Sequence, residues 1–174
     1  MHSGFQDCFL DETGINIGIV KQYGWGKGRV KEHVPDARRP RVTLISAVSL
    51  EGSLAPFMLE GSLNGAIFAD YAEKFLMPSL PRGSVLASLS ARKAARACAA
   101  FLKAGIHVLY LPPYSPDLNP IEIMWAKLKG ILNEENTRSQ EALADAAGSA
   151  LRQVTQEDME GWFLQDGCTR LKYA

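Results

Sequence analysis

Hydrophobic and polar positions alternate with a period of two along the first part of the chain. In residues 5–11, acidic and aromatic side chains occupy one face and Gln6, Cys8 and Leu10 the other. This pattern predicts a strand that ends at Asp11, just before a Thr-Gly turn signal. Further β-rich stretches, separated by Gly-rich or Pro-containing breaks, cover residues 15–23, 29–34, 41–50 and 54–59. Together they predict a meander of antiparallel strands.

From residue 65 the hydrophobic period becomes helical, with Asn64 as a cap and Pro78 as the end of the helix. Further helices are predicted over 91–104, 120–132, 139–153 and 156–165, with short strands over 84–88 and 106–111. Strands followed by alternating strands and helices predict an α/β fold, a mixed sheet flanked by helices, compatible with a ribonuclease-H-like fold. No repeat or second domain is evident, so we expect one domain over residues 1–174.

The formal net charge of zero conceals two segments of opposite charge. Residues 134–166 carry a net charge of −6. Residues 21–41, the basic ribbon, carry +5, and its basic residues are Lys21, Lys27, Arg29, Lys31, Arg38, Arg39 and Arg41. The basic ribbon, with Tyr23 and Trp25 interleaved, is suited to follow a DNA backbone and to stack a base. The alternative is a set of solvated charges on an edge hairpin that discourage strand pairing.

The three cysteines are far apart and form no C-x-x-C motif, which excludes an obvious disulfide framework or zinc site. The first residues do not resemble a secretion signal, and no stretch approaches the roughly 18 apolar residues that span a bilayer. We therefore expect a cytoplasmic protein.

Asp11 lies at the predicted end of a central strand. An ionised carboxylate there is costly unless it is paired or binds a cation, which makes Asp11 a candidate metal ligand. The alternative is a solvated turn, because Asp and Gly are common turn residues.

Residues 114–122, YSPDLNPIE, are the most informative stretch of the chain. Asn119 as cap and Pro120 as first helical residue predict a helix start, and Glu122 either completes a capping box or points at a neighbouring strand. The predicted helix buries an apolar stripe beside Glu122, made of Ile121, Met124, Trp125, Leu128 and Leu132.

Two sequence blocks, one near each end of the chain, resemble motifs of a known transposase family. LDETG near the start and LPPYSPDLNPIEIMWAKLK near the end look like the first and third blocks of the IS630-type DDE transposases, relatives of Tc1/mariner. The intervening APFMLEGSLNGAIFADYAEKFLMP resembles the middle section of the same family, so the likeness covers roughly residues 8–166. The nine-residue YSPDLNPIE match is the specific part.

The resemblance implies a ribonuclease-H-like DDE endonuclease domain in which three carboxylates hold two Mg²⁺ or Mn²⁺ ions. The implied activity is DNA cleavage followed by strand transfer in the transposition of an insertion sequence, a form of DNA recombination. Two such ions activate the nucleophile and stabilise the leaving oxygen of an in-line phosphoryl displacement. By motif, Asp11 matches the first catalytic and metal-binding carboxylate and Glu122 the third.

The second carboxylate is missing. In the family the third carboxylate follows the second after 34 residues, and counting back from Glu122 leads to Ala87. Ser88 and Arg92 likewise stand where the family usually has Asn and His. An alanine methyl coordinates no metal, so we expect severely impaired or absent metal-dependent chemistry. Glu12, on the opposite strand face, Asp70 and Asp117 are weak substitutes.

Two other classes of function stay open. One is a catalytically dead DNA-binding or assembly module derived from a transposase, and the other a structural domain without a nucleic-acid role. Family members place helix-turn-helix modules ahead of the catalytic domain, whereas Met1 lies only ten residues before Asp11. The alternatives are a split or truncated gene, or modules on a separate helix-turn-helix chain. The resemblance implies DNA as the main partner, with a second copy of this chain as a further partner to consider.

Overall fold

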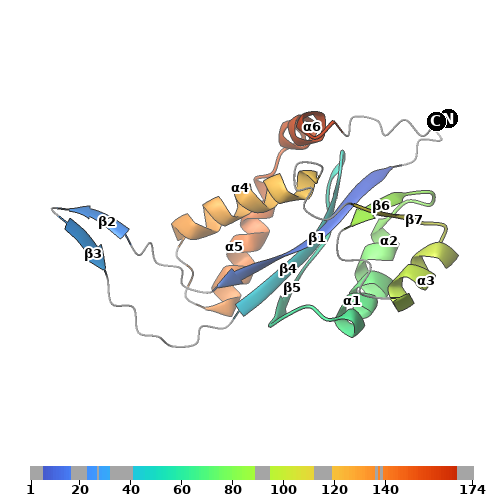
Figure 1. Ribbon diagram of the computed structural model, residues 1–174, viewed down its shortest axis with the longest axis horizontal. Helices are drawn as coiled ribbons and strands as arrows, with labels where there is room; N and C mark the ends of the chain where they lie inside the picture. The colour runs from blue at the N-terminus through green and yellow to red at the C-terminus, as the bar shows by residue number, and fades with distance from the viewer. Residues whose placement is uncertain are drawn as a thin grey trace.

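Five strands form a mixed sheet in the order β5-β4-β1-β6-β7 (Figure 1). The computed structural model describes residues 6–16, 23–26, 28–31, 41–88, 95–111, 119–135, 137 and 139–167. The strands are β1 (Asp7–Asn16), β2 (Tyr23–Gly26), β3 (Gly28–Lys31), β4 (Arg41–Ser49), β5 (Gly52–Glu60), β6 (Val85–Ser88) and β7 (His107–Tyr110). The helices are α1 (Gly65–Tyr71), the π-helical turn η1 (Ala72–Leu76), α2 (Met77–Ser79), α3 (Ala95–Lys103), α4 (Pro120–Glu135), α5 (Gln140–Arg152) and α6 (Gln156–Gln165).

Strand direction follows the connections between strands. β1, β4 and β5 pair antiparallel, as expected for a meander, whereas β6 pairs parallel with β1, and β7 parallel with β6. The parallel pairs are the ones whose connections contain helices, because a parallel pair needs a crossover. The predicted mixed sheet flanked by helices is confirmed.

Each face of the sheet has its own hydrophobic core. Helices α4, α5 and α6 cover one face, the site face, whose core includes Phe9, Val42 and Ala87. Helices α1 and α3 and the turn η1 cover the opposite face, whose core includes Cys8 and Leu10. The alternation predicted for the first strand is therefore confirmed, because its odd and even positions enter different cores.

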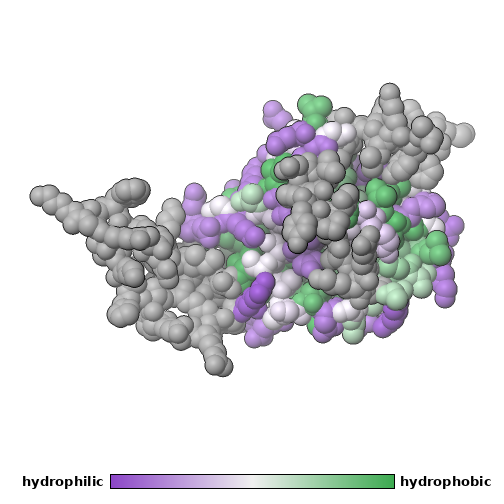
Figure 2. All heavy atoms as spheres, in the orientation of Figure 1, coloured by the Kyte–Doolittle hydropathy of each residue, from purple (hydrophilic) through white to green (hydrophobic). Residues whose placement is uncertain are grey.

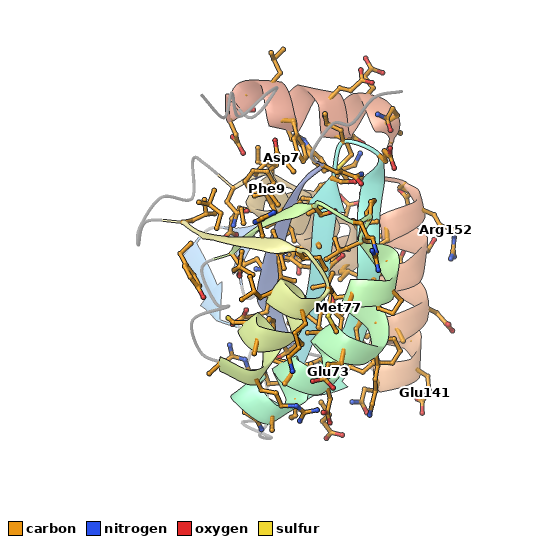
Figure 3. All side chains as sticks on the ribbon, turned by 90° about the vertical axis from the view of Figure 1, so that its right-hand side faces the viewer. Asp7, Phe9, Glu73, Met77, Glu141 and Arg152 are labelled. Carbon is orange, nitrogen blue, oxygen red and sulfur yellow. The ribbon has the colours of Figure 1, made fainter. Side chains whose placement is uncertain are left out.

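α6 reaches the middle of the sheet through one aromatic contact. The rings of Phe9 and Phe163 meet edge to face with centroids 5.5 Å apart, and Figure 3 shows Phe9 beneath α6. At the start of α6, Thr155 and Asp158 form a capping box, and Lys127 of α4 donates to Asp158 at 2.5 Å. α6 is thus fixed both to the sheet and to α4.

Three predicted boundaries are wrong. β1 does not stop at Asp11 but continues to Asn16, because β4 pairs with it along that whole length. Residues 24–26, predicted as a break, belong to β2, which pairs with β3 in a separate two-stranded sheet. The helix predicted to end at Pro78 continues to Ser79 after the π-helical turn. A π turn widens the helix just where the proline ring would meet a carbonyl of the preceding turn.

The other elements lie close to the prediction. Asn64 caps α1 as expected, accepting hydrogen bonds from the backbone N–H groups of Ala66 and Ile67, both at 3.0 Å. The strands β6 and β7 and the helices α4, α5 and α6 each differ from their predicted ranges by a few residues at most. Of the helix predicted over 91–104, the described part is α3.

The visible surface mixes hydrophilic and hydrophobic residues (Figure 2). Within the described part of the chain, the most exposed large apolar side chains are Leu102 on α3 and Leu164 on α6, on different elements. None of the described helices has the length and apolar character needed to cross a membrane.

The anchoring of α6 is testable. Asp158→Ala removes the ion pair with Lys127 and the capping box, so the free energy of unfolding falls by about 1 kcal/mol at pH 7. These partners hold the pKa of Asp158 below its ordinary value, Lys127 most strongly. The stabilisation is therefore present at neutral pH and is lost as the pH falls through that lowered pKa. Urea unfolding of both proteins at several pH values measures the difference.

The matched control is Glu157→Ala, which removes an exposed acid from the same helical turn and is expected to cost less. A destabilisation by Asp158→Ala that does not change with pH contradicts this account.

Candidate active site

Asp11 lies within β1, on the site face of the sheet. It pairs with Ser46 of β4, whereas the pairing of β1 with β6 ends one residue earlier, at Leu10 and Ser88. Asp11 is therefore the first residue of β1 beyond the end of β6. Its side chain is buried, with 8% of the residue exposed. β1 itself continues past Asp11, but the Asp11 carboxyl lies at the end of the neighbouring strand β6.

Helix α4 brings Glu122 to the same place. The predicted apolar stripe of α4 is fully confirmed as buried, and it packs against the site face. Because Glu122 lies beside this stripe in the first turn, its carboxyl comes within hydrogen-bonding reach of the Asp11 carboxyl. The structure thus brings together residues that are 111 positions apart in the sequence.

Burial dominates the electrostatics of this acid pair. The pKa of Asp11 is raised from its ordinary value of 3.8 to about 7, chiefly by burial and in smaller part by the negative charges of Glu12 and Glu122 and the side-chain hydrogen bond with Glu122. A backbone hydrogen bond at Glu12 opposes this rise. Two carboxylates in contact cannot both ionise cheaply without a cation. Asp11 therefore keeps its proton up to about neutral pH.

Ala87 of β6 lies on the same face of the sheet as the acid pair. It pairs with Phe9 in the parallel register, so its side chain points to the site face, as does that of Asp11 two residues further along β1. The residue is 2% exposed and packs in the same core as Phe9 and Ile121. A carboxylate at position 87 would thus point to the face that Asp11 and Glu122 share, where the chain has a methyl group instead.

The two described substitutes for the missing carboxylate, Glu12 and Asp70, do not reach the pair. Glu12 pairs with Ile45 and lies on the opposite face, as predicted. Asp70 is on α1, where it forms a 3.2 Å ion pair with Arg96. Asp117 lies outside the described residues. Among the described residues, no group of three or more His, Cys, Asp or Glu side chains is arranged to hold a metal ion.

Asn119 does not cap α4 with its side chain, contrary to the prediction. Its backbone carbonyl accepts from the N–H of Glu122 at 2.9 Å, as expected at a helix start. Its side-chain Oδ1 and Nδ2, however, have no hydrogen-bond partner, although the residue is fully buried. The capping box is therefore not formed, and Glu122 interacts with Asp11 instead.

Most of the basic ribbon lies outside the described residues. This holds for Lys21, Lys27, Arg38 and Arg39, while Arg29 and Lys31 are described only as backbone positions of β3. Arg41 begins β4 and is exposed. A Cβ on Gly14 would lie 2.8 Å from the Arg41 guanidinium, so this side chain lies over Gly14, on the face opposite Asp11. Arg41 is thus not brought to the acid pair.

Ser46 has no signal in the sequence that singles it out. It is buried beside Asp11, and its hydroxyl donates to the carbonyl of Leu54 at 3.0 Å, where the pairing of β4 with β5 shifts by one residue. At this shift two residues of β5, Ala55 and Pro56, lie opposite Ser46 alone. Ala55 has a positive φ of 46°. Bulges of this kind increase local twist and are common beside active sites. Only the pairing between distant strands identifies Ser46, so no local motif reveals it.

The cost of burying Asp11 is testable in metal-free protein. Because its pKa is raised in the folded state, the unfolded chain ionises first, and stability falls as the pH rises from about 4 towards 7. Asp11→Asn removes this penalty. We expect the variant to unfold at a higher temperature than the parent at pH 8 in EDTA, and the difference to shrink as the pH approaches 4.

Thermal unfolding followed by circular dichroism measures this effect. Asp145→Asn, which neutralises an exposed acid on α5, is the control and should change little at any pH. An Asp11→Asn protein that is less stable than the parent at pH 8 argues against a costly buried carboxyl.

The fold is similar to those of solved mariner transposase structures. A Mos1 mariner paired-end complex with Mn matches with a TM-score of 0.77 and 17% sequence identity, over 93% of this chain and 53% of that chain. A Mos1 transposase catalytic domain with Raltegravir and Mn matches with a TM-score of 0.72 and 16% identity, over 93% and 78%. The chain therefore spans about half the length of the Mos1 chain in the paired-end complex. No curated protein matches.

The sequence itself identifies the family. A family model described as DDE superfamily endonuclease matches residues 7–144, a range that contains Asp11, Ala87 and Glu122. The match covers well over half of the chain, and its fold is the ribonuclease-H-like fold of the transposase catalytic domains above. The chain belongs to the DDE superfamily endonucleases.

Proposed function

We propose that this domain derives from an IS630/Tc1/mariner transposase, that it binds DNA, and that its metal-dependent cleavage and strand transfer are impaired. One observation carries the proposal: Ala87 occupies a β6 position on the sheet face that Asp11 and Glu122 share. In this proposal Asp11 and Glu122 are the remaining catalytic and metal-binding residues.

The described residues do not fit a two-metal centre. Two cations about 3.5–4 Å apart need several anionic ligands to offset their charge. Here only two carboxyl groups lie together, in contact with each other, and the third position is a buried methyl in an apolar core. Mg²⁺ or Mn²⁺ bound there would supply Lewis-acid chemistry to a phosphate. The side chains present supply only a buried acid pair.

Family membership and fold support DNA as the partner. The similar structures include a Mos1 transposase paired-end complex with the left transposon end and a Mos1 strand transfer complex. For this chain, DNA binding depends in our proposal on the basic ribbon. A second copy of the chain and a separate chain with helix-turn-helix modules complete the proposed assembly, in which the separate chain recognises the sequence of the ends.

The central test restores the missing carboxylate. The parent protein should nick DNA no faster than background in Mg²⁺ or Mn²⁺, whereas Ala87→Asp should gain metal-dependent nicking, by at least about tenfold, because a third anionic ligand completes the site. Gel assays on supercoiled DNA measure the rate. Ala87→Asn, which has the same shape without the charge, should stay inactive.

The double variant Asp11→Ala/Ala87→Asp controls for contaminating nuclease and should lose the gain. Robust nicking by the parent protein that disappears on Asp11→Ala would show that the site works without a carboxylate at position 87.

A DNA-binding module without catalysis is the second candidate, and the burial of Ala87 in an apolar core favours it. Replacement of Arg29, Lys31 and Arg41 by alanine should weaken DNA binding. It should also reduce the slope of log K against log salt by about 1 for each phosphate that is no longer neutralised. Fluorescence anisotropy at several salt concentrations measures both quantities. Lys103→Ala/Arg152→Ala removes exposed charges of α3 and α5 and should leave the slope unchanged.

Salt-independent binding, or no binding at all, would favour a structural domain without a nucleic-acid role.

A further inference from the structure

The guanidinium of Arg41 lies directly on the backbone of Gly14. A Cβ built on Gly14 would lie 2.8 Å from Nη2, 2.9 Å from Nε and 3.3 Å from Cζ of Arg41, so its three nearest heavy atoms all belong to one planar group. Gly14 is inside β1, paired with Thr43, and Arg41 begins β4 opposite Asn16. Any side chain at position 14 would therefore occupy the place of the guanidinium.

The backbone conformation does not require a glycine at position 14. A glycine inside a strand weakens the strand, because it has no side chain to pack and loses more conformational entropy on folding. The φ of Gly14 is not positive, in contrast to those of Gly52 and Gly61, so an alanine would adopt the same conformation without strain. A strand glycine of this kind often marks the close approach of another group. Here that group is the Arg41 guanidinium.

Arg41 is held in place, yet its charge is unpaired within the described part of the chain. The residue is exposed. The ion pairs among the described residues use Arg96 and Lys127 as their cations, and none uses Arg41. A long side chain loses rotamer freedom when it binds a ligand, and a guanidinium that already packs on a strand loses less. Arg41 is thus a cation that is oriented before any ligand arrives.

A phosphate is the ligand that suits this cation. The guanidinium presents N–H donors in a rigid fork that matches two phosphate oxygens. Arg41 is also the last basic residue of the basic ribbon, and Figure 1 shows the start of β4 beside the end of β1. Gly14 lies three residues beyond Asp11, about 10 Å at roughly 3.4 Å per residue, and on the other face of the sheet. A phosphate bound by Arg41 is therefore not one that lies beside the acid pair.

We propose that Gly14 positions the guanidinium of Arg41, and that Arg41, held there, binds one phosphate of a DNA backbone. The inference rests on the proposed function in taking DNA as the partner. It goes further in separating this phosphate contact from the acid pair and in giving Gly14 a role. Arg41 is the contact, and Gly14 acts only through Arg41, because its missing side chain leaves room for the guanidinium.

Gly14→Ala tests the positioning, because its methyl group displaces the guanidinium and leaves the charge of the protein unchanged. DNA affinity should fall by about two- to tenfold, since the Arg41 side chain must then be ordered when DNA binds. The slope of log K against log salt should change little, because the number of cations is the same. Fluorescence anisotropy at several salt concentrations measures both quantities.

Variants of Arg41 show whether Gly14 acts through that residue. Arg41→Ala should weaken DNA binding further and reduce the slope by about 1, the effect of one lost phosphate contact. Gly14→Ala/Arg41→Ala should bind DNA like Arg41→Ala, because the methyl group then has no guanidinium to displace. Such non-additivity is expected only for residues that act together.

Urea unfolding separates this role from a structural one. Gly14→Ala should be at least as stable as the parent, because the displaced group is the flexible end of an exposed side chain and alanine restricts the unfolded chain. Gly161→Ala is the matched control. It adds a methyl group on α6, where nothing lies within 4 Å, and should leave DNA affinity unchanged.

The inference is overturned if Gly14→Ala binds DNA as tightly as the parent, if it also weakens binding in the Arg41→Ala background, or if it unfolds more readily than the parent. Arg41→Ala with lowered stability but unchanged DNA affinity overturns it too, since Arg41 then only covers the strand. If the parent binds DNA in a salt-dependent way, any of these results refutes this inference alone and leaves the proposed function in place. No DNA binding by the parent refutes both.

Discussion

The contact between the carboxyl groups of Asp11 and Glu122 is the constraint on which the site depends. It requires β1 to be central, so that Asp11 is buried, and α4 to pack its apolar stripe on the site face, so that Glu122 stays at the stripe's edge. The same packing that stabilises the domain therefore brings two acids together at a free-energy cost. Hydrophobic burial along α4 offsets that cost, as expected where a scaffold holds a strained functional group.

Local patterns predict the site because each of its parts has its own signal. Asp11 follows an alternating strand, and Glu122 follows a helix start with a clear apolar stripe, so their convergence needs only the family's fold to connect them. Ala87 follows from the family's spacing, and the β6 register shows its side chain on the site face. The role of these residues in catalysis stays a prediction, because geometry alone does not establish it.

The sequence is a poorer guide where distant partners decide the outcome. The Thr-Gly pair after Asp11 is a turn signal, yet β4 pairs past it and keeps the strand extended. Asn119 has the local features of a cap, but its side-chain amide has no partner, and the Glu122 side chain interacts with Asp11. Ser46 owes its place beside Asp11 to strand pairing across 35 positions. In each case a tertiary contact outweighs a local preference.

The short strand β6 limits which sheet face the side chain at position 87 can occupy. All four of its residues are buried, and its register is fixed by pairing with β1 along one edge and with β7 along the other. A register slip by one residue would move every side chain of β6 to the opposite face of the sheet, so the fold holds position 87 in place. The fold thus keeps the side chain at position 87 on the site face, whichever residue occupies that position.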